Sequence, residues 1–117
     1  DLLVDSSGNL WVSTLGGGIS LWNGLGWSHI RPSNSDLPYA TVTDVEENGP
    51  GVFWIATSIP NNTGGLVSRL QGDEWHTYKP IFSGYTGAET LAIARDSLGR
   101  MWFATRTQGI YVFEEEK

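Results

Sequence analysis

The sequence predicts an all-β chain built from repeated four-stranded antiparallel units. Three observations predict this fold class: a ten-residue pattern that recurs, turn residues at regular intervals, and strands that are apolar on both faces. The pattern occurs three times without a gap, as DSSGNLWVST at residues 5–14, NGPGVFWIAT at 48–57 and DSLGRMWFAT at 96–105. The copies begin 43 and 48 residues apart, close to the period of about 40–45 residues that is typical of blade-type repeats.

Each copy stands at the same place in a unit of four expected strands. The first strand precedes the pattern, where Leu2, Val45 and Ile93 share one phase. The second strand is the end of the pattern, the third follows Gly17-Gly18, Gly64-Gly65 or Gln108-Gly109, and the fourth contains Trp27 or Trp75. Gly, Asn and Asp turns separate the strands, and no window has helical periodicity. The expected class is therefore all-β.

The second strand of each unit is apolar on both faces. One face carries the repeated tryptophans, Trp11, Trp54 and Trp102, and the other carries the apolar residues on either side of them in sequence. A strand with one face in water would alternate apolar and polar residues. We therefore expect each sheet to be covered on both faces, with the three tryptophans packed between neighbouring sheets. Four-stranded sheets stacked around an axis in this way form a β-propeller.

The predicted fold is thus a β-propeller segment of nearly three four-stranded antiparallel blades, in a single partial domain over residues 1–117. Blade 1 covers about residues 1–32, blade 2 about 41–80, and blade 3 about 89–117, where the last strand is missing. A propeller closes with roughly four to eight blades. We therefore expect a segment of a larger propeller, or one part of an oligomeric ring.

Composition excludes several function classes. The chain has no cysteine, which excludes disulfide scaffolds, thiol catalysis and thiolate zinc sites. Its net charge of −6 argues against nucleic acid as a partner, because a basic surface is the expected footprint there. No apolar run approaches the roughly 18 residues of a membrane span, so no membrane segment is expected in this chain.

The repeat DxxGxΦWΦxT, the GG-Φ element after it and the connector Asn34-Ser35-Asp36-Leu37-Pro38 together resemble the two-component regulator propeller repeat, over essentially the whole chain. The resemblance implies a bacterial sensor propeller, periplasmic or extracellular, that serves signal transduction. It also implies that the module recognises small carbohydrate fragments. The three structural repeats, the unlike loops at one end and the lack of a catalytic constellation favour a non-enzymatic ligand-sensing or binding segment.

Residues that could carry chemistry have structural interpretations that we favour. Asp5 and Asp96 recur with fixed spacing, but aspartates cap tight turns through side-chain bonds to the backbone, and the glycine three residues on accepts the positive φ of such a turn. The glycine pairs at 17–18 and 64–65 lack the strand-to-helix context of a phosphate loop, so close backbone approach is the expected reason for them. No catalytic residue, metal site or cofactor is predicted.

The candidate ligand-binding residues combine aromatic rings with hydrogen-bond donors. Most belong to loops that do not follow the repeat. These loops are expected at the end of the sheets that carries the connections between the second and third strands and between successive units, where segments 31–41, 58–63, 79–89 and 106–108 differ among the units. Trp22 is included because it has no tryptophan counterpart, its equivalents being Arg69 and Phe113 or residues nearby. The full set is Trp22, Arg31, Tyr39, Arg69, Tyr85, Arg106 and Gln108.

Two further functions remain open at this point. A streptogramin-lyase-like propeller enzyme would need His29 or His76 to meet Glu89 or another carboxylate around the axis, although the two histidines are expected on opposite strand faces. A protein-interaction or self-assembling scaffold would follow from the apolar face that a terminal blade exposes. In that case self-association would complete a ring.

Overall fold

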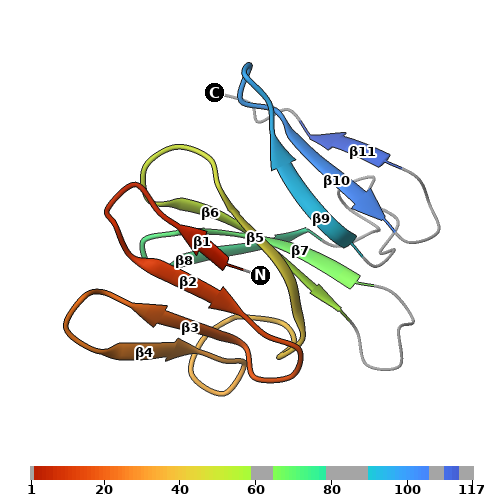
Figure 1. Ribbon diagram of the computed structural model, residues 1–117. Coiled ribbons are helices and arrows are strands. Elements are labelled where there is room, and N and C mark those ends of the chain that lie inside the picture. Colours follow the sequence, from red (N-terminus) through yellow and green to blue (C-terminus); the bar gives the residue numbers. More distant parts are fainter. Residues whose placement is uncertain (1, 59–64, 79–89, 106–109, 114–117) are drawn as a thin grey trace.

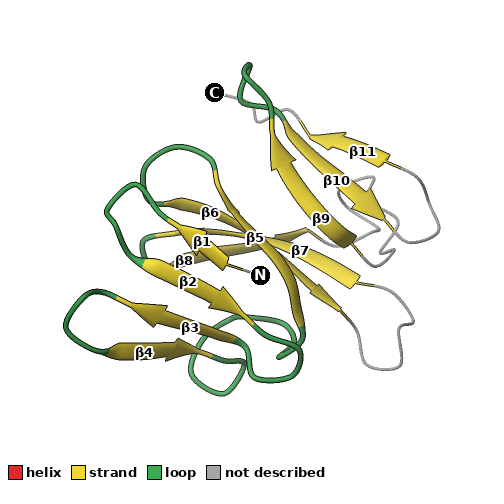
Figure 2. Ribbon diagram, in the orientation of Figure 1, coloured by secondary structure: helices red, strands yellow, loops and turns green. Residues whose placement is uncertain are grey.

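The computed structural model describes residues 2–58, 65–78, 90–105 and 110–113, and these residues form β-strands and no helix (Figures 1 and 2). The strands are β1 (Leu2–Val4), β2 (Leu10–Ser13), β3 (Ile19–Trp22), β4 (Trp27–Ile30), β5 (Val42–Glu47), β6 (Val52–Ser58), β7 (Gly65–Gln71), β8 (Glu74–Tyr78), β9 (Thr90–Arg95), β10 (Met101–Thr105) and β11 (Ile110–Phe113). The all-β prediction is confirmed.

The strands form three antiparallel sheets in chain order, as Figure 1 shows. Sheet 1 has the order β1-β2-β3-β4, sheet 2 the order β5-β6-β7-β8, and sheet 3 the described strands β9-β10-β11. Each strand pairs with its neighbour in sequence, as predicted for four-stranded antiparallel units. The expected shared phase is also confirmed, since Leu2, Val45 and Ile93 pair with Val12, Ile55 and Phe103.

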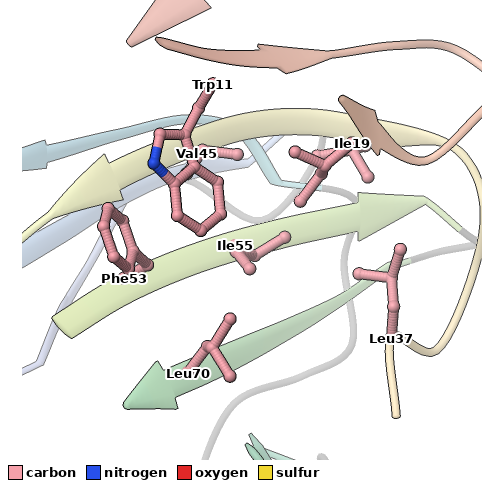
Figure 3. Close-up of a cluster of buried hydrophobic side chains, with 8 residues drawn as sticks. Trp11, Ile19, Leu37, Val45, Phe53, Ile55 and Leu70 are labelled. Atoms are coloured by element: carbon pink, nitrogen blue, oxygen red, sulfur yellow. The ribbon is translucent and has the colours of Figure 1, made fainter. Parts of the chain in front are cut away.

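The first core lies between sheets 1 and 2 (Figure 3). Here the face of β2 that carries its tryptophan meets the face of β6 that carries Phe53 and Ile55. Trp11 of β2 stacks on Phe53 of β6, with ring centroids 4.0 Å apart and planes at 29°. Ile19 from sheet 1 and Val45 and Ile55 from sheet 2 fill the space around them. We call the face that carries Trp11, Trp54 or Trp102 the tryptophan face of its sheet, and the opposite face the reverse face.

The second core repeats this arrangement between sheets 2 and 3. Trp54 on the tryptophan face of sheet 2 contacts Phe103 on the reverse face of sheet 3, with centroids 5.9 Å apart. Ala56 and Val67 from sheet 2 and Met101 from sheet 3 complete this cluster. The tryptophan faces of sheets 1 and 2 therefore pack on the reverse face of the sheet that follows in the chain, and sheet 2 is covered on both sides as predicted.

The prediction that all three repeated tryptophans are packed between sheets is wrong for Trp102. Its exposed fraction is 37%, compared with 4% for Trp11 and 0% for Trp54. The physical reason is position, because no further sheet of the described chain covers the tryptophan face of sheet 3. The reverse face of sheet 1 is uncovered in the same way, and Leu2, Val4 and Trp27 on it are exposed.

The predicted equivalence of Trp22 and Arg69 also needs correction. Trp22 pairs with Leu10, and the residue at the same register in sheet 2 is Leu70, which pairs with Phe53. In sheet 3 the equivalent is Phe113, opposite Met101, as predicted. An alignment of the units on their glycine pairs is one residue out of register in the second unit. It would match Ile19 with Leu66, whereas Val67 has the buried position that Ile19 has in the first unit.

The turn between the first two strands of each unit is built as predicted. The Asp5 carboxylate accepts the N–H groups of Ser7 and Asn9 at Oδ1, both at 2.9 Å, and Asp96 does the same for Leu98 and Arg100. The glycine that follows has positive φ in all three units, at Gly8, Gly51 and Gly99. The interpretation of this pattern as a turn is confirmed.

The first turn is also bonded to the second unit, and the second turn to the third. Glu47 accepts the N–H and Oγ–H of Ser6, both at 2.8 Å, and the N–H of Gly51 at 3.0 Å. Asn48, which stands at the Asp position of the second copy, donates from Nδ2 to the carbonyl of Gly99 at 3.0 Å. Polar contacts thus join the three sheets at one end, in addition to the two apolar cores.

Gly18 shows why a glycine pair follows the second strand. Its φ is +76°, and a Cβ at this position would lie 2.3 Å from the carbonyl oxygen of Ile30. The Gly18 N–H donates to Ala40 O at 2.7 Å, so the β2–β3 turn is held against the segment that leads into sheet 2. Close backbone approach, the predicted reason, is confirmed at Gly18.

We expect Gly18→Ala to lower the free energy of unfolding by about 3–4 kcal/mol, since strain at positive φ costs about 1–3 kcal/mol and moving the backbone away from the new Cβ adds about 1–3 kcal/mol. Gly24→Ala is the matched control, because Gly24 has φ +93° but a Cβ added there would have no neighbouring atom within 4 Å. Urea unfolding of both variants measures the difference. Equal losses would contradict the role of the Ile30 contact.

Candidate functional site

The structure separates the described members of the predicted ligand-binding set. Arg31 and Tyr39 lie in the loop between β4 and β5, where Arg31 is exposed and Tyr39 half-buried. Trp22 lies at the far end of β3 on the reverse face of sheet 1, with its ring tilted against Trp27 at 5.3 Å. Arg69 lies in the middle of β7 opposite Trp54, and its Nη2 donates to Gln71 Oε1 at 3.2 Å. These four side chains do not share one site.

The other three predicted residues, Tyr85, Arg106 and Gln108, lie outside the described residues, as does Glu89. Their assignment to a ligand-binding rim stays a prediction. The described part of the rim is the loop over residues 31–41, and it leads to a different site from the predicted one.

A cleft of about 380 Å³ lies at the junction of sheets 1 and 2, lined by His29, Ile30, Asn34, Ser35, Asp36, Leu70, Gly72, Asp73 and Trp75. We call it the seam cleft. One wall is the end of β4 and the loop after it, and the other is the β7–β8 hairpin with its turn. Neither sheet forms the cleft alone, so the packing of the two sheets creates it.

The loop wall is held in place by its own polar side chains. The Asn34 side chain accepts the N–H of Arg31 at 2.8 Å and donates to the carbonyl of His29 at 3.0 Å. The Ser35 hydroxyl donates to the carbonyl of Arg31 at 2.6 Å. Leu37 is buried in the core between sheets 1 and 2, which anchors the loop. The connector motif singled out in the sequence therefore shapes this wall of the cleft, and Figure 3 shows its Leu37 in the buried cluster.

Two of the polar groups that line the seam cleft are carboxylates. Asp36 and Asp73 are exposed, and neither has a hydrogen bond or ion pair within the part of the chain that the structure describes. Beside them lie the half-buried Trp75 and the buried Leu70, both packed against the first core. The cleft thus offers a fixed apolar surface with two acidic hydrogen-bond acceptors at its edge.

His29 and His76 lie on opposite faces of equivalent strands, as the sequence predicts. His29 pairs across the sheet with Ser20, whose Oγ lies 3.0 Å from His29 Nδ1, on the reverse face of sheet 1. His76 pairs with Arg69 in sheet 2, one residue after Trp75. The described residues therefore bring no second histidine to His29, and its ring belongs to the exposed sheet face.

Two carboxylates with raised pKa values lie on β5, at the junction of sheets 2 and 3. Burial raises the pKa of Asp44, whose Oδ2 accepts the N–H of Ile93 at 2.6 Å and whose Oδ1 accepts the N–H of Val45 at 2.9 Å. Burial also raises the pKa of Glu46, and the nearby Arg95 opposes this shift. Because both Asp44 oxygens accept backbone N–H groups of β5 and β9, this side chain joins two sheets.

The turn aspartates have lowered pKa values. Burial by itself raises the pKa of Asp5, but hydrogen bonds from Trp11 Nε1 and from the N–H groups of Asn9 and Ser7 outweigh it and hold this pKa below the ordinary 3.8. The hydrogen bond from Trp102 Nε1, 2.9 Å from Oδ2, is the largest of the contacts that hold the pKa of Asp96 well below its usual range. Asp5 Oδ2 likewise accepts a hydrogen bond from Trp11 Nε1 at 2.9 Å. The sequence does not predict this bond.

The described residues contain no group of three or more His, Cys, Asp or Glu side chains placed to hold a metal ion. They also contain no helix with the length and hydropathy needed to cross a membrane. No family model and no curated protein matches the chain. The site must therefore be interpreted from its own geometry.

The seam cleft contains residues that sequence reasoning missed. From the sequence, Trp75 is expected as a repeated strand residue and Asp73 as part of a turn. Asp36 belongs to the connector, where the sequence gives it no role of its own. No sequence signal could place Asp36 and Asp73 on one cleft, because the cleft depends on how the two sheets pack together.

Proposed function

We propose that the chain is a β-propeller segment that binds a small carbohydrate at the seam cleft and catalyses no reaction. The observation that carries this proposal is the cleft itself, which is lined by a tryptophan packed on the first core and by two carboxylates that have no partner among the described residues. The resemblance to the two-component regulator propeller repeat supports a sensor role, in a periplasmic or extracellular setting, for such a binding module.

The propeller arrangement is supported by the repeated contact between sheets. Trp11 on Phe53 and Trp54 on Phe103 are the same kind of contact at successive junctions. The first strands also lie close together, since β5 contacts β1 on one side and β9 on the other. In a propeller the first strand of every blade lies nearest the axis, so both features are those expected of consecutive blades.

A carbohydrate fits the chemistry of the cleft. The apolar face of a sugar ring can pack on an indole, while its hydroxyl groups donate hydrogen bonds to carboxylates. Trp75 supplies the indole, and Asp36 and Asp73 supply the acceptors. Because Asp36 and Asp73 are both acidic and the chain carries a net charge of −6, a neutral sugar or an amino sugar is favoured over a uronate.

The test is a titration of the protein with neutral, amino-sugar and uronate oligosaccharides, followed by calorimetry and by tryptophan fluorescence. We expect binding of neutral or amino-sugar oligomers. Asp36→Asn and Asp73→Asn should each weaken it about tenfold, since a hydrogen bond to a charged group contributes about 1.5–3 kcal/mol. Glu74→Gln is the matched control, because it removes an exposed carboxylate next to Asp73 that does not line the cleft.

Three results would contradict this proposal: no heat or fluorescence change across the panel, equal affinity in the double variant Asp36→Asn with Asp73→Asn, or a loss in Glu74→Gln as large as in Asp73→Asn. All three substituted side chains are exposed, so the variants are expected to fold as the parent chain does.

A further inference from the structure

The turn between β3 and β4 contains an Asn-Gly pair whose side chain is held for reaction with its own backbone. We propose that Asn23 and Gly24 form a site of spontaneous covalent modification, at which the asparagine amide is lost as ammonia and an aspartate or an isoaspartate is left. Neither residue lines the seam cleft, so this inference does not rest on the proposed carbohydrate.

The reaction consumes one water molecule and releases one ammonia molecule, with no oxidation or reduction. The backbone nitrogen of Gly24 attacks Cγ of Asn23 and gives its proton to solvent base, and the new N–Cγ bond closes a five-membered succinimide ring. The Cγ–Nδ2 bond breaks, and Nδ2 takes up a proton and leaves as ammonia. Water then opens the ring at either carbonyl. Glycine suits the attacking position because it has no Cβ to crowd the nitrogen.

The turn holds the Asn23 side chain in an arrangement that favours this attack. Its Oδ1 accepts the N–H of Leu25 at 2.8 Å and the N–H of Gly26 at 3.0 Å. As the Gly24 nitrogen attacks Cγ, negative charge develops on Oδ1, and N–H groups already aimed at that atom stabilise the charge. Among the described residues, no hydrogen bond involves Asn23 Nδ2 or the Gly24 N–H. The leaving group and the nucleophile are therefore both available.

A second Asn-Gly pair, Asn48 and Gly49, is held in the opposite way. Asn48 is half-buried, and its Nδ2 donates to the carbonyl of Gly99 at 3.0 Å. The amide that would have to leave is thus bonded to the turn of sheet 3. No N–H group of the described residues donates to Asn48 Oδ1. The same two residue types therefore form one activated site and one protected site.

The equivalent turn of sheet 2 has glutamine in place of this asparagine. Gln71 precedes Gly72 between β7 and β8, as Asn23 precedes Gly24 between β3 and β4. The glutamine side chain is one carbon longer, so the same attack would close a six-membered ring and would require one more rotatable bond to be fixed. Asn23→Gln is therefore expected to remove the reaction while keeping a residue that this kind of turn accepts.

The modification is expected to change the end of the β3–β4 hairpin. Both products carry a negative charge at position 23. In the isoaspartate the main chain runs through Cβ and Cγ, which adds a backbone atom to the turn that joins the paired residues Trp22 and Trp27. The tilted contact between these two rings, with centroids 5.3 Å apart, should therefore be disturbed in that product.

The test follows amide loss in the full chain, in mildly alkaline buffer, by mass spectrometry of chymotryptic peptides. Cleavage at Trp27 and Tyr39 separates the two sites, and chromatography separates aspartyl from isoaspartyl products. In the folded chain we expect Asn23 to react about tenfold faster than Asn48, since one hydrogen bond of ordinary strength corresponds to about that factor. In guanidinium chloride the two sites should react at equal rates, and Asn23 no faster than in the folded chain.

Three variants test the roles of the individual groups. Asn23→Gln should leave position 23 unmodified. Gly26→Pro removes one of the two N–H donors and should slow the reaction about tenfold relative to Gly26→Ala, which keeps this N–H. A Cβ at Gly26 would have no neighbouring atom within 4 Å, so Gly26→Ala is the matched control.

Near-ultraviolet circular dichroism checks that the variants are folded. If Gly26→Pro does not fold, the comparison of the folded with the unfolded parent chain decides by itself. Equal rates at Asn23 and Asn48 in the folded chain, a faster reaction of Asn23 after unfolding, or equal rates in folded Gly26→Pro and Gly26→Ala would overturn the proposal.

Discussion

Trp54→Ala is expected to lower the free energy of unfolding by about 3–5 kcal/mol, the range for removing a fully buried aromatic side chain. Trp54 is fully buried and contacts Phe103 across the junction of sheets 2 and 3. Its removal would leave a cavity in the apolar cluster between the two sheets, beside Ala56, Val67 and Met101. Denaturant unfolding followed by circular dichroism measures the change.

Trp102→Ala is the control at the equivalent register. Trp102 is part of the same repeat, but it is exposed on the uncovered face of sheet 3. We expect a loss of about 1 kcal/mol, from its partial burial and from the hydrogen bond to Asp96. Both variants are compared at a protein concentration where the parent chain is monomeric. Equal losses at the two positions would contradict the packing of sheet 2 on sheet 3.

Asp5→Asn is expected to lower the free energy of unfolding by about 2 kcal/mol at neutral pH. The carboxylate accepts Trp11 Nε1 at 2.9 Å in a buried contact, as well as two backbone N–H groups. Hydrogen bonds to a charged group contribute about 1.5–3 kcal/mol, and an asparagine amide would present N–H groups to the indole donor or leave it unsatisfied. Thermal or urea unfolding measures the loss.

The same variant has a defined dependence on pH. The pKa of Asp5 in the folded chain is lower than the ordinary 3.8, so its stabilising contribution is fully present above that value. The contribution is lost as pH falls through the folded pKa. The difference in stability between the parent chain and Asp5→Asn should therefore be constant near neutral pH and shrink below about pH 4. A difference that grows with acid would contradict the assignment.

Much of the fold could be predicted because the repeat contains two kinds of information. The spacing of its Asp and Gly residues predicts the turns, and its apolar residues on both strand faces predict how the sheets pack. Asp5 and Asp96 fold back on the backbone two and four residues later, and the following glycines have positive φ. The alternation around Trp11 and Trp54 indicates a sheet that is covered on both faces, and the two cores show this for sheet 2. These features depend on local spacing, which the sequence states directly.

The features that the sequence did not predict depend on contacts between units. The register of β7 differs by one residue from the glycine alignment, because burial of Val67 and Leu70 determines the pairing. Trp102 is exposed because of where its sheet stands in the described chain. The bond between Asp5 and the Trp11 indole spans six residues and needs the folded hairpin.

The candidate site was predicted least well. Loops that differ among the units are expected to carry recognition, and one of them, residues 31–41, does line the seam cleft. The other wall, with Trp75 and Asp73, belongs to the regular hairpin of the next unit. Nothing in the spacing of these residues indicates that a loop of sheet 1 lies against the β7–β8 turn.

The central claim is that successive sheets pack tryptophan face on reverse face, and nuclear Overhauser contacts between aromatic side chains test it most directly. The account predicts cross-peaks from the Trp11 indole to the Phe53 ring and from the Trp54 indole to the Phe103 ring. Cross-peaks from either indole to a different set of rings, with none to these partners, would contradict it.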